Sequence, residues 1–433
     1  MKKVLVIISI LAVFAILGLS ISTAPIFNSN TDVSLGLKDF DELSPEVQAL
    51  IDKDVEEALA NKETNEDVAE ETPTQNEEAV VETSNIEAQS MALGGSILCE
   101  DITCSYEPRG DGLYITKYTA VSGDEPQLII PDSPTTKIVG IAEGAFKGLK
   151  KLKTVDLSHS AIKKIGMSAF YGCTSLTDVT FPDTLEEVGG YAFINTPWLK
   201  TQRAEANQSS LKNRLVIVKG ILIDGIAAEG EVNIDYANGI SKISPYAFSY
   251  NSKMTKLTIT GINEVPYRLC SSATGLQELV TETNVIHIAP FSFFDCSALT
   301  KVTMSDVSIV DRAAFYECNK LATITFGNSL TKINNNAFMN CYGLTELTFP
   351  ASLESIDVSG FLNCSSLRTL MFNKSEGSID LAQGAFQNCT RLDAVTIDPL
   401  DSQLLNIKTN GATFNYPDGS KKITFFNTKV EIP

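Results

Sequence analysis

Phenylalanine recurs along this chain at nearly constant spacing, and this repeat limits the fold more than any other feature of the sequence. Nine phenylalanines share one local sequence context: Phe146, Phe170, Phe193, Phe248, Phe293, Phe315, Phe338, Phe361 and Phe386. Cys270 takes the same place in a tenth copy. Successive members are 22 to 25 residues apart, except for one step of 55 residues between Phe193 and Phe248. A constant period of this length predicts a solenoid of about ten stacked coils.

Two columns of aliphatic residues keep the same spacing as the phenylalanines. Five residues before each member of the phenylalanine column stand Ile141, Ile165, Val188, Ile243, Val265, Ile288, Val310, Ile333, Ile356 and Leu381. Eight residues before stand Ile138, Ile162, Leu185, Ile240, Ile262, Val285, Val307, Leu330, Leu353 and Ser378. One copy cannot bury so many apolar side chains, whereas stacked copies align them in a continuous core.

A second segment follows each member of the phenylalanine column and reads Leu-x-x-Val-x-Phe, as in Leu176, Val179 and Phe181. The alternation of apolar and polar residues at its end indicates a short strand. Pro182 and Pro350 follow two of these segments and cannot donate to a strand ladder. Each coil is therefore predicted to hold one short parallel strand, a turn, and an irregular or short helical return.

The pattern Ile-x-x-x-Ala-Phe-x-x-Cys-x-x-Leu of residues 333–344 resembles the BspA-like type of bacterial leucine-rich repeat. The resemblance covers about residues 106–397. Within the long step, residues 192–200 (AFINTPWLK) and 215–224 (LVIVKGILID) look like the inserted hairpin of that family. We therefore expect an insertion at about residues 196–238.

Residues 111–118 (DGLYITKY) and 128–131 (LIIP) look like the starting half-repeat of the same family. We expect a leucine-rich-repeat solenoid over residues 99–433, with an N-terminal cap at 99–135 and a C-terminal cap, or alternatively an assembling edge, at about 398–433. The resemblance also implies a surface protein that attaches to host or matrix proteins, or to other microbes.

The first 24 residues are typical of an export signal. Lys2 and Lys3 precede an apolar run over residues 4–21, which are the positive and hydrophobic regions of a signal peptide. The run is about 18 residues long, at the short end of what spans a bilayer, so an N-terminal membrane anchor is the alternative. We expect an exported protein, extracellular or at the cell surface, that meets the membrane only through this segment.

Residues 25–98 are acidic, with 18 Asp and Glu against three Lys, so most of the net charge of −19 belongs to them. A Ser-Pro pair that fits a helix start, followed by apolar residues at helical spacing, predicts a helix near residues 45–60. Residues 61–89 have too few apolar residues to form a core, so we expect a mostly disordered stalk. No basic face appears, which argues against nucleic-acid binding.

Six of the nine cysteines share one column, three residues after the phenylalanine: Cys173, Cys296, Cys318, Cys341, Cys364 and Cys389. Metal ligation or disulfides are one interpretation of such a column in an exported protein. We favour a column of buried thiols, because Cys is among the most buried residue types and other residues fill the column in four coils. Cys99 and Cys104 lie outside the column, and a local disulfide between them is predicted at the open edge of the solenoid.

The sequence offers no constellation for catalysis. Its two histidines, His159 and His287, belong to coils far apart, so they form neither a two-histidine metal site nor a catalytic triad. No P-loop, dinucleotide-binding glycine pattern or zinc-binding helix motif occurs. We therefore predict no catalytic residues, no metal site and no cofactor.

The outward positions of the predicted strands form the candidate binding face, which we expect on the concave side of the solenoid. Its members are Asp156, Asp178, Thr180, Lys256, Thr258, Glu278, Lys301, Thr303, Thr325, Glu346 and Thr348. A structural ladder of threonines is the alternative, because Thr favours strands and pairs across them.

The sequence favours one of three functions. We favour a secreted or surface-displayed, non-enzymatic protein that binds an extracellular protein, of the host matrix or of another cell's surface, through the solenoid face. The alternative is an envelope scaffold that assembles through the solenoid ends. An enzyme is the third, and no residues support it.

Overall fold

The computed structural model describes residues 45–64, 95–130, 136–208, 214–373, 378–382, 384–392, 394–397, 406–409, 413–415 and 422–424. The predicted signal or anchor segment, most of the predicted disordered stalk and most of the predicted C-terminal cap lie outside these residues. The chain divides into a unit of residues 1–34 and a unit of residues 35–433, and every described residue belongs to the second. Within the described residues, no helix has the length and apolar character needed to cross a bilayer.

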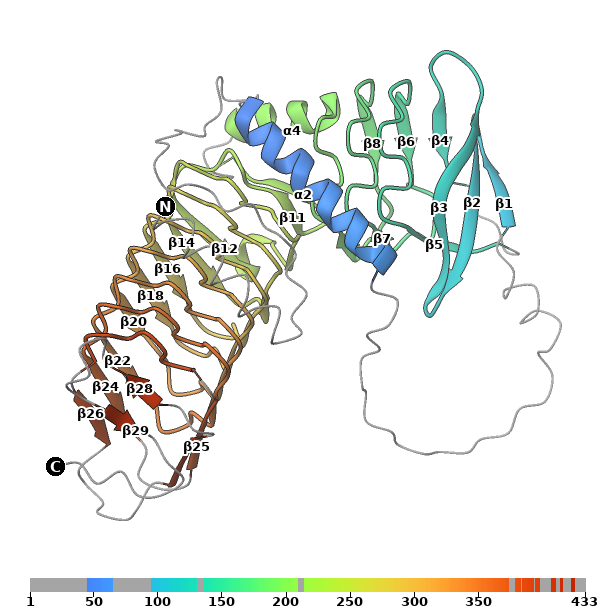
Figure 1. Ribbon diagram of the computed structural model, residues 1–433. Helices are drawn as coiled ribbons and strands as arrows, with labels where there is room; N and C mark the ends of the chain where they lie inside the picture. Colours follow the sequence, from blue (N-terminus) through green and yellow to red (C-terminus); the bar gives the residue numbers. More distant parts are fainter. Residues whose placement is uncertain are drawn as a thin grey trace, which may run out of the picture. The chain divides into compact units, whose positions relative to one another are not determined.

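The second unit contains a parallel β-solenoid of about 11 turns, which confirms the predicted fold class (Figure 1). A typical coil contributes two short strands, one more than the sequence predicts. One strand comes from the Leu-x-x-Val-x-Phe segment, and the other from the aliphatic column five residues before the phenylalanine. Each strand pairs in parallel with its equivalents in the neighbouring coils.

We call the sheets formed by the Leu-x-x-Val-x-Phe segments the strand face. Their strand orders are β4-β6-β8, β12-β14-β16-β18-β20 and β22-β24-β26. The strands are β4 (Gln127–Ile129), β6 (Thr154–Asp156), β8 (Asp178–Thr180), β12 (Gly230–Asp235), β14 (Met254–Thr260), β16 (Glu278–Thr281), β18 (Lys301–Met304), β20 (Thr323–Thr325), β22 (Glu346–Phe349), β24 (Thr369–Phe372) and β26 (Ala394–Ile397). In β18, for example, Val302 and Met304 are buried while Lys301 is exposed, which is the alternation expected of a half-buried strand.

The second strands form three further sheets, with orders β1-β2-β3-β5-β7-β9, β10-β11-β13 and β15-β17-β19-β21-β23-β25-β27. Many of the strands in these sheets are only two residues long. The first two sheets contain β1 (Gly95–Cys99), β2 (Ile102–Arg109), β3 (Gly112–Val121), β5 (Ile138–Ile141), β7 (Lys164–Ile165), β9 (Glu187–Val188), β10 (Val216–Val218), β11 (Ile221–Asp224) and β13 (Lys242–Ile243). In the third they are β15 (Glu264–Val265), β17 (His287–Ile288), β19 (Ile309–Val310), β21 (Lys332–Ile333), β23 (Ser355–Ile356), β25 (Ser378–Leu381) and β27 (Asn406–Thr409).

The solenoid begins with an antiparallel meander, β1-β2-β3, from which the chain enters the first coil. Strand β3 then pairs in parallel with β5, and β4 pairs in parallel with β6, so the parallel part of one sheet begins at β3 and that of the other at β4. Near the other end, β28 (Thr413–Asn415) and β29 (Lys422–Thr424) form an antiparallel pair. The described helices are α2 (Pro45–Thr64), α4 (Pro197–Gln208) and the short 3-10 helix η1 (Tyr236–Asn238).

The phenylalanine column forms two stacks of parallel rings in the core. The first stack has ring centroids 5.2 and 5.3 Å apart and contains Phe146, Phe170 and Phe193. The second has centroids 5.0 to 5.2 Å apart and contains Phe293, Phe315, Phe338, Phe361 and Phe386. The column is interrupted around Phe248 and Cys270, and the buried side chains accordingly form two hydrophobic clusters.

Two residues of each of the ten coils with a member of the phenylalanine column have a positive φ angle, one two residues before that member and one two residues after it. In one coil these are Ala313 (φ 54°) and Glu317 (φ 63°), and in the next Asn336 (φ 59°) and Asn340 (φ 65°). An α-helix cannot continue through such a residue, because the left-handed region costs an L-residue about 1–2 kcal/mol. The returns are therefore irregular series of turns, and apart from α4 the described coils contain no helix there.

Asparagine occupies the second of these left-handed positions in three successive coils. The Asn363 Nδ2 donates to the Asn340 Oδ1 at 2.7 Å, and the Asn388 Nδ2 donates to the Asn363 Oδ1 at 2.8 Å. The Asn340 Nδ2 in turn donates to the Glu317 carboxylate at 2.7 Å. Asparagine has two roles at these positions. It tolerates a positive φ angle, and its side-chain amide links one coil to the next.

The long step of the repeat contains a complete coil that lacks a phenylalanine. It comprises α4, the hairpin β10–β11 and strand β12, which join the two kinds of sheet. The Gly225 amide donates to the Ala247 carbonyl, which is the same coil-to-coil hydrogen bond that the Phe146 amide makes to the Ala169 carbonyl in the first ring stack. A Cβ atom at Gly225 would lie 2.2 Å from the Phe248 ring, so only glycine fits. The predicted hairpin is therefore present, together with a helix and an eleventh coil.

Candidate functional site

All eleven residues of the candidate binding face lie on the strand face, with exposed or half-buried side chains. Asp156, Asp178 and Thr180 lie on its first sheet, Lys256, Thr258, Glu278, Lys301, Thr303 and Thr325 on its second, and Glu346 and Thr348 on its third. The parallel register sets Glu278 between Lys256 and Lys301. Equivalent side chains therefore form continuous rows across hydrogen-bonded strands.

The charges on the strand face are largely paired within the chain. The Glu278 carboxylate lies 2.9 Å from the Lys301 ammonium group and 3.5 Å from that of Lys256. The hydrogen bond from Lys301 lowers the pKa of Glu278. On the first sheet, hydrogen bonds from Ser158 and Thr180 lower the pKa of Asp156. A ligand would meet a face rich in hydrogen-bonding groups and with little unpaired charge.

The six column cysteines are all buried in the core. Each Sγ contacts the backbone carbonyl of the phenylalanine-column residue one coil earlier, at 3.1 to 3.3 Å. Each of these carbonyls already accepts a backbone amide within its own turn, so the thiol adds a second contact that links one coil to the next. Burial raises the pKa of Cys173 to about 12, and it raises that of Cys296, Cys341 and Cys364 well above the ordinary thiol value.

Cys99 and Cys104 are diagonal neighbours in the β1–β2 pair, opposite Ile102 and Ile97 respectively, and are buried. Both carry free thiols in the structure, so their disulfide stays a prediction. A hydrogen bond between the two thiols raises the pKa of Cys104 and lowers that of Cys99. Among the described residues, no group of three or more His, Cys, Asp or Glu is arranged to hold a metal ion.

The folded chain is expected to resist thiol-labelling reagents, because the reactive species is the thiolate and burial disfavours it. Labelling with a chromogenic disulfide at pH 8 should give no fast phase before unfolding. After unfolding without reductant, nine thiols should react if Cys99 and Cys104 are free, and seven if they are joined. Fast labelling of the folded chain at a column cysteine would contradict the buried column.

A second surface, which the sequence did not indicate, is a row of aromatic rings at the turns around the phenylalanine column. We call it the aromatic strip, and its members are Tyr171, Tyr191, Tyr246, Tyr250, Tyr267, Phe291, Phe294 and Tyr316. Ring centroids are 4.5 Å apart between Tyr191 and Tyr246, and 5.7 Å apart between Tyr246 and Tyr267. Contacts of 6.0, 6.1 and 5.4 Å continue the row through Phe291 and Phe294 to Tyr316. The strip therefore crosses from the first hydrophobic cluster toward the second.

Helix α2 packs on the first part of the aromatic strip. Its residues Val47, Ile51 and Val55 are buried, four residues apart along one edge of the helix. They share a hydrophobic cluster with the four strip tyrosines Tyr171, Tyr191, Tyr246 and Tyr250. The helix lies where the sequence predicts one, but it packs on the solenoid, which the sequence did not indicate.

The polar contacts of α2 also fall on strip tyrosines. The Tyr250 and Tyr191 hydroxyls donate to the Asp54 carboxylate at 2.6 and 3.1 Å. Desolvation raises the pKa of Asp54, while the hydrogen bond from Tyr250 and the charge of Arg268 oppose the rise. At the next position along the strip, the Tyr171 hydroxyl bonds to Asp52. Acidic side chains of α2 therefore accept hydrogen bonds from the rings that its apolar edge covers.

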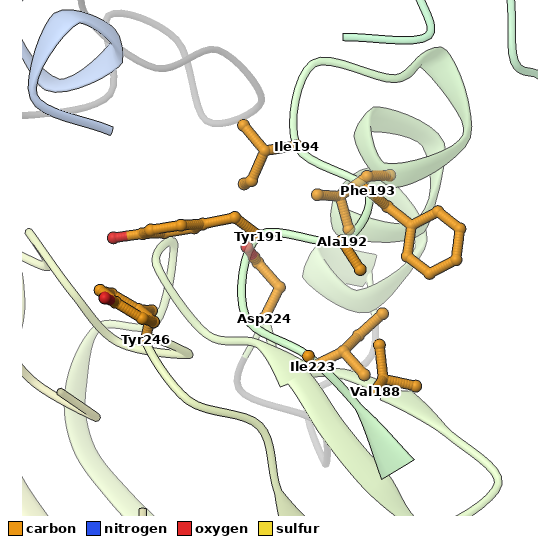
Figure 2. Close-up of a pocket in the computed structure, with 10 residues that line it drawn as sticks. Val188, Tyr191, Ala192, Phe193, Ile194, Ile223, Asp224 and Tyr246 are labelled. Atoms are coloured by element: carbon orange, nitrogen blue, oxygen red, sulfur yellow. The ribbon is translucent and has the colours of Figure 1, made fainter. Parts of the chain in front are cut away.

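Figure 2 shows a small pocket at the junction of α4 and β11, lined by Tyr191, Tyr246, Asp224 and seven further residues. Its volume of about 10 Å³ is room for about one water molecule. Beside it, Arg203 of α4 holds Asp224 of β11 through two hydrogen bonds, at 2.9 and 2.7 Å. The pocket is too small for an organic ligand, and the buried ion pair beside it holds α4 against β11.

The two histidines are not brought together. His287 lies between Glu264 and Asp311, with its Nε2 atom 3.2 Å from the Asp311 carboxylate. That hydrogen bond raises the pKa of His287. His159 is exposed and contacts Ser158, several coils away.

Comparison with solved structures gives several leucine-rich-repeat proteins. One from Bacteroides ovatus is 17% identical, with 72% of this chain and 99% of that chain covered and a TM-score of 0.29. One from Eubacterium ventriosum is 17% identical, with 72% and 98% covered and a TM-score of 0.36. A leucine-rich cell surface protein from Faecalibacterium prausnitzii is 18% identical, with 70% and 95% covered and a TM-score of 0.29. All three TM-scores are below 0.5, so these likenesses carry no further weight.

No curated protein matches the chain significantly. The model of the BspA-type leucine-rich repeat region does match, in six copies, at residues 127–215, 232–318 and 287–416. These segments cover more than half of the chain and coincide with the coils described above. The chain belongs to the BspA-type leucine-rich-repeat family.

Proposed function

We propose that this chain is a surface-displayed, non-enzymatic binding protein that recognises an extracellular protein through the strand face. The single observation that carries the proposal is the row of outward side chains on strands β14, β16, β18 and β20, which stay in register across four coils. An extended surface of this kind suits a long segment of another protein. Membership of a leucine-rich-repeat family supports a binding role.

The paired charges of the strand face favour recognition by short-range hydrogen bonds. Because Lys256 and Lys301 already pair with Glu278, little net field remains to steer a charged partner. The threonines Thr303 and Thr325 stand side by side and present hydroxyl groups beside this charged row. We therefore expect binding at this face to depend only weakly on ionic strength.

Display at the cell surface is part of the same proposal. Residues 1–24 would export the chain or anchor it, and residues 25–44, which precede the helix packed on the solenoid, would separate the solenoid from the envelope. The partner would be a protein of the host matrix or of another cell's surface. No nucleic acid and no cofactor belong to the proposal.

The strand face can be tested by adding bulk and charge to it without disturbing the core. The double variant Thr303→Arg/Thr325→Arg is expected to reduce capture of extracellular-matrix proteins from a panel by at least about tenfold. Ser329→Arg is the matched control, because Ser329 is exposed in the turn after β20 and lies off the strand face. Surface-coupled chains would be exposed to each protein and the bound amount measured by surface plasmon resonance.

Equal capture by the double variant and by the parent chain would exclude the strand face as the binding surface. Light scattering of the same samples distinguishes the scaffold alternative. A chain that forms long assemblies and captures no matrix protein would favour the scaffold over the binding protein.

A further inference from the structure

We propose that the uncovered end of the aromatic strip, formed by Tyr267, Phe291, Phe294 and Tyr316 with Arg268 and Arg312, is a docking surface for an acidic, amphipathic helix of a partner protein. This surface lies at the turns of the coils and is separate from the strand face. It goes beyond the proposed function, because it adds a second binding surface with a defined kind of ligand.

Helix α2 of this chain is the internal example of such a ligand. It carries six acidic residues and two lysines over residues 45–64. Its apolar edge is buried on strip tyrosines, and its Asp54 carboxylate accepts two tyrosine hydroxyls. The strip therefore already binds the combination of an apolar helix edge and carboxylates on the flank of that edge.

The strip continues past α2 without a break in ring contacts. Tyr246 is 6% exposed beneath α2, whereas its ring neighbour Tyr267 is 38% exposed. Phe291, Phe294 and Tyr316 follow and are half-buried. The uncovered end thus continues the row with two tyrosines and two phenylalanines, and none of the described residues lies over it as α2 does.

Two guanidinium groups give the uncovered end its charge. The Arg268 guanidinium lies 5.2 to 5.7 Å from the centroids of Tyr267, Phe291 and Phe294, and Arg312 lies 5.2 Å from that of Phe291. The Arg268 Nε donates to the Tyr267 hydroxyl at 3.0 Å, and the charge of Arg268 also acts on Asp54 of α2. Arg312 is exposed and lies flat on the Phe291 ring, which leaves its N–H edge for a carboxylate. A partner with acidic flanks therefore complements this surface.

The same contacts disfavour a sugar ligand. Sugars stack on the free face of an aromatic ring, but here Arg268 covers ring faces and Phe294 stacks on Tyr316 with an interplanar angle of 2°. Tyr267 and Phe291 meet edge to face, at 78°. Ring edges and guanidinium groups remain, which suit the apolar edge of a helix and its carboxylates.

The test uses the full chain and a fluorescent peptide with the sequence of residues 45–64, which is an acidic amphipathic helix. Fluorescence anisotropy should show saturable binding that weakens as NaCl is raised. Arg312→Glu should weaken it at least about tenfold, because charge repulsion replaces attraction. Arg312→Lys should keep part of the affinity. A peptide of the same composition in scrambled order, which lacks the apolar edge, should not bind.

Three controls make the outcome decisive. Arg312 is exposed, so Arg312→Glu should leave the thermal unfolding midpoint unchanged, and Phe294→Ala provides a second variant at the same surface. Thr303→Arg, on the strand face, should leave peptide binding unchanged. Loss of binding on Tyr250→Phe but not on Arg312→Glu would show that the peptide exchanges with α2, and would overturn the proposal. It would also be overturned by no peptide binding, or by neutral oligosaccharides that bind in its place and are lost in Phe294→Ala.

Discussion

Replacing Arg203 with methionine is expected to lower the free energy of unfolding by about 3–5 kcal/mol, because the change leaves the Asp224 carboxylate buried without its partner. The Arg203 and Asp224 side chains are 6% and 7% exposed and share two hydrogen bonds. The pair ties α4 to β11, and β11 contributes residues to both hydrophobic clusters. Urea unfolding followed by circular dichroism should show a lower midpoint at an unchanged slope.

Two controls separate burial from charge. The double variant Arg203→Met/Asp224→Leu removes both charges and should recover most of the loss, since a buried ion pair contributes little over apolar residues. Lys219→Met breaks a pair of 2.6 Å with Asp183, whose side chain is fully exposed. That change should cost less than about 1 kcal/mol. If Arg203→Met and Lys219→Met cost the same, burial is not the source of the effect.

The core of this fold could be predicted because its requirements repeat. Each coil must place an aromatic ring and two aliphatic side chains against the same positions of its neighbours, so Phe170, Phe315 and Phe338 mark the spine in the sequence as clearly as in the structure. The outward positions follow from the same register by alternation. This is why the sequence alone predicts that Glu278 and Lys301 lie on one face, as the structure shows.

The second strand of each coil and the eleventh coil could not be predicted in the same way. A two-residue strand such as Ile309–Val310 is too short to show alternation. In the eleventh coil the ring of Phe248 occupies the space beside Gly225, so the marker residue is absent from the sequence. The left-handed residues are equally hidden, because Ala313 and Glu317 are not residue types that announce a positive φ.

The aromatic strip could not be predicted from the sequence, for a different reason. Its rings stand at several offsets from the phenylalanine column, with Tyr191 two residues before it, Tyr171 one after it and Tyr250 two after it. They form one surface only because the turns bring these offsets together. The contact of α2 with Tyr250 spans 196 residues, and no local pattern encodes it. The only sequence feature that points to this contact is the row of apolar residues at helical spacing in α2, which needs a surface to pack against.

Replacing Phe338 with alanine is expected to lower the free energy of unfolding by about 3–5 kcal/mol, the range for losing a fully buried phenylalanine and leaving a cavity. The Phe338 ring is 0% exposed and stacks on Phe315 at 5.1 Å and on Phe361 at 5.0 Å. Phe326 contacts its edge at 6.1 Å. Both flanking rings lose a partner, and the backbone of the coils prevents them from closing the gap. Urea unfolding measures the loss.

Because each coil contacts only its neighbours, the damage should also be local. Hydrogen exchange should show lost protection in the strands near Phe338, β20 to β23, while β5 to β8 beside Phe146 and Phe170 keep theirs. Met371→Ala is the matched control, since Met371 is 39% exposed on the strand face, and should change stability by less than about 0.5 kcal/mol. Equal loss of protection beside Phe170 and Phe338 would mean that the two ring stacks unfold as one unit, and that the interruption at Phe248 and Cys270 does not divide the core.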